Sequence, residues 1–266
     1  MVIKVLLLVA GYGTRLQQDL RASPSHHHLL GVPKALLPLG QEDALITYWL
    51  DLFKASGIPA SDIYLVTNAA SYSVFVSWAN RHQVPLVNVF NDGTMSNEDR
   101  LGAVPDINLA VKHFGLGQDS VLVVGGDTLF LKDFVFNNFF QTAKTHPNRS
   151  LVTVYSVPDE DVSKVGIIET NSKGVVTSFL EKPEPSETSS RYACPCFYLF
   201  VPNALSLLDA FIDESKGKPK EEVDATGKFL AYLFPRCPVG TFPISGRIDV
   251  GGLSSYLQAD VYYKSM

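Results

Sequence analysis

Hydrophobic residues in the first half of the chain gather in short runs, with longer stretches of mixed polarity between them. Buried strands are predicted at four of these runs, Val2–Val9, Ile63–Thr67, Leu86–Phe90 and Val121–Val124. Apolar residues recur at helical spacing in the intervening stretches Ala44–Ser56, Ser73–Arg81 and Ile107–Phe114. This alternation is typical of a mostly parallel sheet covered by helices, which binds ligands beyond the carboxyl ends of its strands.

The pattern changes after residue 150. Gly166–Glu169 and Val175–Leu180 flank the turn Asn171–Gly174, and the three segments together predict a β-hairpin. A further strand is expected at Tyr198–Val201 and a helix at Asn203–Asp213.

Three polar stretches are predicted to be surface loops. Glu184–Arg191 and Asp213–Asp224 are rich in Ser, Pro, Glu and Lys, as solvated loops usually are. Gln17–Gly31 contains the adjacent histidines His26–His28, which cannot all face one ion. A flexible surface loop is therefore expected there rather than a metal site.

The composition favours one large α/β domain over two small ones. The chain has 266 residues, of which 46% are hydrophobic and 18% are charged, so that a sizeable core is available. We expect a single α/β domain over residues 1–266, Rossmann-like in its first half, with a mixed, mostly parallel central sheet flanked by helices. The net charge of −5 argues against nucleic acid as a partner, but a local cluster of Lys and Arg still allows binding of a nucleotide.

The cysteine content and the start of the chain bear on localisation. Three cysteines, Cys194, Cys196 and Cys237, suit reduced thiols in a cytoplasmic protein better than a disulfide framework. A zinc site made by these three and a histidine is the alternative. The first ten residues lack a signal-peptide pattern, and no apolar run approaches the roughly 20 residues that span a bilayer, so no membrane association is expected.

The first predicted strand leads directly into Ala10-Gly11-Tyr12-Gly13-Thr14-Arg15. A glycine-containing loop after a strand places backbone N–H groups where phosphate oxygens accept hydrogen bonds, and Gly11 and Gly13 leave room for close approach. Arg15 would then neutralise the charge of a polyphosphate. The alternative is a structural turn followed by a surface arginine.

A second segment, Val32-Pro-Lys-Ala-Leu-Leu-Pro-Leu-Gly40, places Lys34 between two prolines in a stretch too apolar for a solvated loop. Pro33 restricts the backbone before Lys34, which suits a positioned cation. Together, A-G-x-G-T-R-L and P-K-A-L-L-P-L-G resemble the nucleotide-binding signature of the sugar-1-phosphate nucleotidylyltransferases, of the glucose-1-phosphate thymidylyltransferase type. The spacing between the two segments is longer here than is usual in that family.

Further landmarks of this family follow in order, and the resemblance spans roughly residues 2–260. They are the strand ending Val121-Leu-Val-Val-Gly-Gly-Asp127, the hairpin start Gly166-Ile-Ile-Glu169, the hairpin end Phe179-Leu-Glu-Lys-Pro183 and Gly246-Arg-Ile-Asp-Val-Gly-Gly252. One departure is Tyr192-Ala-Cys-Pro-Cys-Phe-Tyr198, where relatives carry small residues facing the sugar. Alternation along a strand would place Cys194 and Cys196 on one face, either in the acceptor pocket or in the core.

The resemblance implies the residues of the site. The nucleotide would be bound by the glycine loop and its neighbours Ala10, Gly11, Tyr12, Gly13, Thr14, Arg15, Lys34 and Gly102. The sugar phosphate would be bound by Gly166, Glu181, Lys182 and Cys196. Arg15, Lys34 and Lys182 would be the catalytic cations.

Asp127 and Asp249 are the implied ligands of Mg²⁺, which prefers carboxylate and phosphate oxygens. Taken without the resemblance, Asp127 also suits a helix N-cap, Asp249 a turn, and Lys182 a surface position. The family places recognition of the nucleobase near Leu101-Gly102-Ala103, whereas composition alone suits a solvated loop at 91–103.

The implied reaction joins a nucleoside triphosphate and a sugar 1-phosphate into an NDP-sugar with release of pyrophosphate. The nucleotide part is expected at about residues 1–135 and the sugar-phosphate part at about 136–266. The base is expected to be that of dTTP or UTP rather than of CTP, GTP or ATP. Two alternatives are a non-sugar acceptor, as in a phosphocholine cytidylyltransferase, and a catalytically silent nucleotide-sugar sensor. Homo-oligomer formation is left open by the sequence.

Overall fold

The computed structural model describes residues 2–220, 223–248 and 250–265. It clusters into two compact units. Unit 1 comprises Met1–Leu6, Leu101–Val124 and Phe130–Arg247, and unit 2 comprises Leu7–Arg100, Gly125–Leu129 and Ile248–Met266. None of the helices in the described part of the chain combines the length and the apolar character that a membrane span requires.

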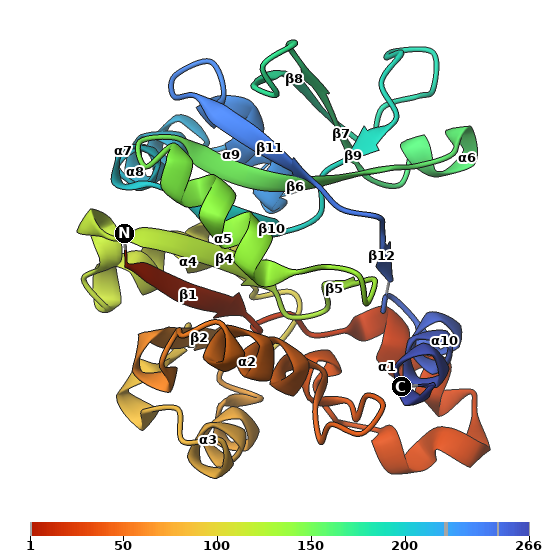
Figure 1. The fold of residues 1–266 in the computed structure, drawn as a ribbon. Helices are drawn as coiled ribbons and strands as arrows, with labels where there is room; N and C mark the ends of the chain where they lie inside the picture. The colour runs from red at the N-terminus through yellow and green to blue at the C-terminus, as the bar shows by residue number, and fades with distance from the viewer. Residues whose placement is uncertain (1, 221–222, 249, 266) are drawn as a thin grey trace. The chain divides into compact units, whose positions relative to one another are not determined.

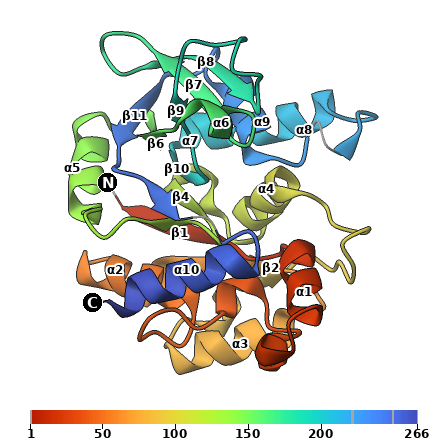
Figure 2. The same cartoon turned by 90° about the vertical axis from the view of Figure 1, so that its right-hand side faces the viewer.

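Unit 2 contains the adjacent strands β3, β2 and the end of β1 (Ile3–Leu8), in that order. β2 and β3 pair in parallel, with Leu65 opposite Val89. Figure 2 shows the C-terminal helix α10 running beside α1, where the Asp19 carboxylate accepts a hydrogen bond from the first amide of α10. The remaining elements are α1 Thr14–Arg21, η1 Pro24–Leu29, η2 Lys34–Leu36, α2 Leu45–Ala55, η3 Ala60–Asp62, β2 Ile63–Thr67, α3 Tyr72–Arg81, η4 Leu86–Asn88, β3 Val89–Asn91 and α10 Leu253–Lys264.

Unit 1 continues from β1 in the order β1-β4-β10-β6-β9-β7-β8. β10 pairs antiparallel with both β4 and β6, whereas β11 lies parallel to β6 (Figure 1). Its elements are α4 Ala103–His113, η5 Leu116–Gln118, β4 Ser120–Gly125, α5 Phe136–Thr145, β6 Ser150–Ser156, α6 Asp159–Val162, β7 Gly166–Thr170, β8 Val176–Glu181, β9 Tyr192–Ala193, β10 Phe197–Phe200, α7 Pro202–Leu205, α8 Leu208–Glu214, α9 Thr226–Leu233 and β11 Val239–Pro243. The short strands β5 Leu129–Phe130 and β12 Arg247–Ile248 complete the described elements.

The predicted mixed sheet flanked by helices is confirmed, and the antiparallel pairs of β10 make it mixed. Every residue of β4 is buried, which explains its unbroken apolar sequence. Helix α2 buries a stripe of large side chains that recur at helical spacing, Leu45, Ile46, Trp49, Leu50 and Phe53.

The prediction of a loop over Gln17–Gly31 is wrong. Residues 17–21 belong to α1, and the three histidines lie on the 3₁₀-helix η1. Leu16 and Leu20, four residues apart, are both buried. The Gln17 side chain closes the segment, since its amide donates to the Val32 carbonyl and accepts from the Gly31 amide.

Other predicted boundaries shift for local reasons. The strand expected at Leu86–Phe90 begins only at Val89, because Asn88 turns a buried amide to the carbonyls of Ser61 and Ile63. The helix expected from Ile107 begins earlier, at Ala103. The single helix expected at Asn203–Asp213 is divided into α7 and α8.

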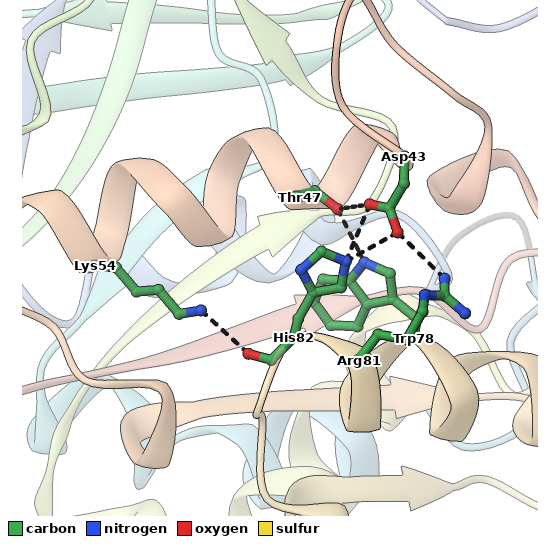
Figure 3. Close-up of polar contacts among 6 residues, drawn as sticks. All are labelled: Asp43, Thr47, Lys54, Trp78, Arg81 and His82. Carbon is green, nitrogen blue, oxygen red and sulfur yellow. Dashed lines mark hydrogen bonds and ion pairs between the residues drawn. The ribbon is translucent and has the colours of Figure 1, made fainter.

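A polar network joins the start of α2 to the end of α3 (Figure 3). The Asp43 carboxylate accepts hydrogen bonds from Thr47 at 2.6 Å and from His82 at 2.9 Å, and it also contacts Arg81. The Trp78 indole N–H donates in turn to the Thr47 hydroxyl at 3.0 Å. Burial raises the pKa of Asp43, but the hydrogen bonds from Thr47 and His82 outweigh it, and the pKa lies below its usual value. The network therefore favours an ionised Asp43.

Gly126 occupies the tightest point at the end of β4. A Cβ atom there would lie 2.7 Å from the Val9 side chain and 2.8 Å from the Leu8 carbonyl oxygen. The Gly126 amide donates to that same carbonyl at 2.9 Å, so the backbone has no freedom to withdraw. Glycine is therefore required for this close approach of two backbones.

We expect Gly126→Ala to lower the free energy of unfolding by about 1–3 kcal/mol, because the added methyl overpacks a contact formed partly by backbone. Urea denaturation of the purified protein measures the effect. Gly117→Ala is the matched control, since a Cβ at Gly117 meets no atom within 4 Å. Equal stability of the two variants would contradict the assignment of a steric requirement at Gly126.

Candidate functional site

The glycine loop leads from β1 into helix α1 within unit 2. Gly13 is the N-cap of α1 and has a φ of 58°, a left-handed conformation that favours glycine. A Cβ at Gly11 would meet nothing within 4 Å, so this part of the loop is open. Thr14 and Arg15 lie exposed in the first turn of α1. The loop therefore presents the amide end of a helix together with a cation, an arrangement suited to anions.

Lys34 and Asp127 meet beside this loop. The Lys34 Nζ atom lies 2.9 Å from Asp127 Oδ2. A Cβ at Gly13 would lie 3.7 Å from the Lys34 Cβ, so the lysine stem passes against the loop. The side chain of Lys34 is 18% exposed and that of Asp127 is 46% exposed. The structure thus brings together three predicted site residues, Gly13, Lys34 and Asp127, that are far apart in the sequence.

Gly102 belongs to unit 1 and is the N-cap of α4, with a φ of 107°. Asp224 approaches it closely, and the Ala103 amide donates to the Asp224 carboxylate at 3.0 Å and to its carbonyl at 3.1 Å. The first amide of this helix is therefore already bonded within the protein. Asp224 was not identified from the sequence.

A second cluster of predicted residues lines a cavity of about 160 Å³ in unit 1. Three of the residues expected to bind the sugar phosphate, Gly166 of β7, Glu181 of β8 and Cys196, contribute to its wall. Lys182 does not line it. Cys194, expected either in the acceptor pocket or in the core, also lines it. The sequence did not identify other lining residues, namely Tyr155, Lys164, Tyr198, Thr226, Gly227 and Arg247.

Two glycines allow the cavity wall to form. A Cβ at Gly166 would lie 2.6 Å from Phe179 Cζ, and a Cβ at Gly227 would lie 2.4 Å from the same atom. The Cβ at Gly227 would also lie 2.5 Å from Glu181 Oε2. Gly227 therefore lets α9 pack directly on β8 and fixes where the Glu181 carboxylate lies.

Glu181 carries an unfavourable charge in this cavity. Burial raises its pKa, and the positive charges of Lys182 and Lys228 offset the shift only in part. A partly buried carboxylate with neighbouring cations in a cavity is a candidate for binding hydroxyl groups of a ligand.

Lys182 lies exposed just outside the cavity with a φ of 50°, a left-handed conformation that is rare for a residue with a side chain. The following Pro183 and this conformation restrict the backbone, and the Lys182 amide donates to the Val165 carbonyl at 3.1 Å. Such strain costs on the order of 1–2 kcal/mol and is often found at functional positions.

The expectation that Cys194 and Cys196 share one face of a strand is wrong. Both lie between β9 and β10, outside any strand, and the Cys194 amide donates to the Gly166 carbonyl at 2.9 Å. Cys194 is buried, and burial raises its pKa, so it stays a neutral thiol. Among the described residues no group of three or more His, Cys, Asp and Glu side chains suits a metal ion, which leaves the zinc alternative without support.

Arg247 is the missed residue with the clearest sequence signal, because it lies inside the landmark Gly246–Gly252. Its Nε atom donates to the Tyr155 hydroxyl at 3.0 Å, at the edge of the cavity. Asp249, in the same landmark, lies outside the described residues. Its predicted role as a metal ligand therefore stays a prediction.

Glu181→Gln should stabilise the protein near neutral pH, because it removes a charge that burial disfavours. The folded pKa of Glu181 lies above the ordinary value of about 4.3, so its contribution to stability is full below that pH and is lost as pH rises through the folded pKa. Thermal unfolding should give a higher Tm for the variant at pH 7 and equal Tm values near pH 4. A variant less stable than wild type at pH 7 would contradict the burial argument.

The sequence model of the Nucleotidyl transferase family matches residues 4–265. UTP–glucose-1-phosphate uridylyltransferase of Synechocystis sp. is 22% identical over 269 residues, which cover 97% of this chain and 62% of that protein. UTP–glucose-1-phosphate uridylyltransferase 1 of Streptococcus pyogenes serotype M3 is 25% identical over 287 residues, which cover 98% of this chain and 88% of that protein. The chain therefore spans less than two thirds of the Synechocystis relative.

The fold is also similar to that of solved structures. The crystal structure of apo UDP-glucose pyrophosphorylase superposes with a TM-score of 0.74 at 20% identity, and the alignment covers 100% of this chain and 99% of that one. The fold predicted from the sequence is thereby confirmed. Because the matched segment includes the glycine loop, Lys34, Asp127 and the cavity residues, the chain belongs to the Nucleotidyl transferase family.

Proposed function

We propose that this chain transfers a nucleotidyl group from a nucleoside triphosphate to a sugar 1-phosphate. The observation that carries the proposal is that Gly13 and Lys34, expected to bind the nucleotide, meet Asp127, expected to bind its Mg²⁺. The cavity that collects Gly166, Glu181 and Cys196 supports the acceptor half. The names of the curated relatives favour UTP and glucose 1-phosphate as the first pair of substrates to test, ahead of dTTP.

The nucleotide half is assigned to unit 2. Gly11 and Gly13 leave space beside the backbone, and the amides in the first turn of α1 donate hydrogen bonds to phosphate oxygens. Arg15 and Lys34 stabilise the charge that accumulates on the departing pyrophosphate.

The acceptor half is assigned to the cavity of unit 1. The Glu181 carboxylate accepts hydrogen bonds from sugar hydroxyls, and the Cys196 thiol limits the space for substituents. Lys182, Arg247 and Lys164 add positive charge in or beside the cavity, which favours the phosphate of the acceptor.

In the proposed reaction a phosphate oxygen of the sugar 1-phosphate forms a bond to the α-phosphorus, and the bond from that phosphorus to the bridging oxygen of pyrophosphate breaks. No covalent enzyme intermediate is required, since positioning and charge neutralisation account for phosphoryl-type transfer. Asp127 supplies a hard, half-exposed oxygen donor that fits Mg²⁺, which usually takes one or two carboxylates plus substrate phosphates. When bound, the ion would withdraw negative charge from the phosphates.

The proposal is tested by measuring pyrophosphate release with UTP, dTTP, CTP, GTP and ATP against a panel of sugar 1-phosphates and phosphocholine. Release with at least one sugar 1-phosphate is expected. Release with phosphocholine alone would identify a non-sugar acceptor. Binding of nucleotide or NDP-sugar without release for any pair would identify a sensor and refute the proposed reaction.

Arg15 and Lys182 should affect different substrates. Arg15→Ala should lower kcat/KM for the nucleotide, and Lys182→Ala should lower it for the sugar phosphate, each by about tenfold or more, as expected for a lost charged hydrogen bond. Initial rates with each substrate varied in turn give both values. An effect of Lys182→Ala on the nucleotide alone would refute its assignment to the acceptor.

Asp127→Asn should keep the fold, because the side chains are nearly isosteric, and should lower kcat on the order of a hundredfold. Turnover is measured across a titration of Mg²⁺. Asp119→Asn is the matched control, since Asp119 directly precedes β4 whereas Asp127 follows it. Turnover near the wild-type value in Asp127→Asn would remove the support for a metal at this position.

A further inference from the structure

Tyr12 stands between Gly11 and Gly13 in the glycine loop. The residue is partly buried, and its hydroxyl lies 2.8 Å from Thr94 Oγ1, in the loop that follows β3. The two residues are separated by 82 positions in the sequence. The contact therefore joins the loops that follow two different strands of unit 2.

The direction of this hydrogen bond follows from its neighbours. The Thr94 hydroxyl donates to Asp92 Oδ1 at 2.8 Å, and the Thr94 amide donates to the same oxygen at 2.7 Å. A hydroxyl group has a single proton to donate, so Thr94 can only accept from Tyr12. The chain of donors therefore runs from the Tyr12 phenol through Thr94 to a carboxylate, and the charged acceptor at its end strengthens it.

Both loops are also fixed from the end of β2. The buried Asn68 amide donates to the Ala10 carbonyl at 2.8 Å, and Asn68 Oδ1 accepts from the Ser71 amide at 2.8 Å. On the other side the Ala69 amide donates to the Thr94 carbonyl at 2.8 Å. The contact between Tyr12 and Thr94 closes a ring of hydrogen bonds. The rest of the ring runs from Ala10 through Asn68 and Ala69, just after β2, to the Thr94 carbonyl.

We propose that Tyr12 and Thr94 are positioning residues for the nucleoside triphosphate, an inference that rests on the proposed function. The hydroxyl bridge holds the glycine loop and the Asp92–Thr94 loop in one arrangement before the nucleotide arrives. Pre-organisation of this kind lowers the entropy that is lost on binding and so increases affinity. The bridge acts on the nucleotide and leaves the sugar phosphate unaffected.

The decisive variants remove only hydroxyl groups. Tyr12→Phe and Thr94→Val should each raise the Kd and the KM for the nucleotide by about three- to tenfold, the usual effect of one hydrogen bond. The KM for the sugar phosphate should stay unchanged. The double variant should be no worse than Thr94→Val alone, because Thr94→Val already removes the bridge together with the hydrogen bond to Asp92, and Tyr12→Phe removes only the bridge. Thr94→Ser keeps a hydroxyl and should restore most of the affinity.

Tyr232→Phe is the matched control. In the wild type the Tyr232 hydroxyl donates to Glu214 at 2.6 Å in unit 1. The loss of this hydroxyl removes a comparable hydrogen bond elsewhere and should not change the Kd for the nucleotide. Calorimetric titration with UTP and the other triphosphates gives Kd without turnover, and thermal unfolding reports stability for every variant.

Three outcomes overturn the inference: an unchanged Kd in Tyr12→Phe, equal increases in both KM values, or additive effects in the double variant. A wild type that binds a triphosphate without turnover would refute the proposed reaction, and the Kd comparison would still decide the role of Tyr12. A wild type that binds none of the triphosphates would overturn both.

Discussion

The close approach of Gly126 to the end of β1 is the constraint on which the nucleotide side of unit 2 depends. Because no Cβ is present, the Gly126 amide reaches the Leu8 carbonyl, and the strand ends of β1 and β4 meet at backbone distance. Asp127 follows immediately, and it is there that Lys34 reaches it. A bulkier residue at position 126 would separate the glycine loop from the Asp127 carboxylate. The absence of a side chain at Gly126 therefore determines which charges Asp127 lies beside.

Local sequence was sufficient where a residue's role depends on its neighbours in the chain. The apolar run before Asp127 predicted a buried strand, and the strand-to-glycine transition at Gly11–Gly13 predicted a loop with room for a ligand, although the helix α1 that follows it was not predicted. The turn at Asn171–Gly174 predicted the hairpin of β7 and β8. The hairpin in turn places Gly166 opposite Glu181, so that both line the cavity of unit 1, whereas their role in binding a sugar phosphate was expected from the resemblance and stays a prediction.

Long-range contacts account for what the sequence did not reveal. Glycine is required at position 227 only because α9 packs against β8 there. Asp224 has a role only because it accepts a hydrogen bond from the amide of Ala103, the first residue of α4. The segment 17–31 is closed by Gln17, whose side chain reaches across to Gly31 and Val32. In each case the partner is distant in sequence and has no characteristic spacing, so periodicity contains no information about it.

The ion pair between Lys34 and Asp127 means that each charge is the other's counter-ion before any ligand arrives. A phosphate that contacts Lys34, or a cation that contacts Asp127, exchanges one partner for another and does not meet a bare charge. Ion pairs that are open to solvent contribute only about 0–1 kcal/mol, and the 46% exposure of the Asp127 side chain, against 18% for Lys34, brings water to one side of this pair and lowers the cost of the exchange. A ligand that binds only one of the two side chains therefore leaves the charge of the other without its partner. A triphosphate accompanied by a cation would neutralise both charges at once.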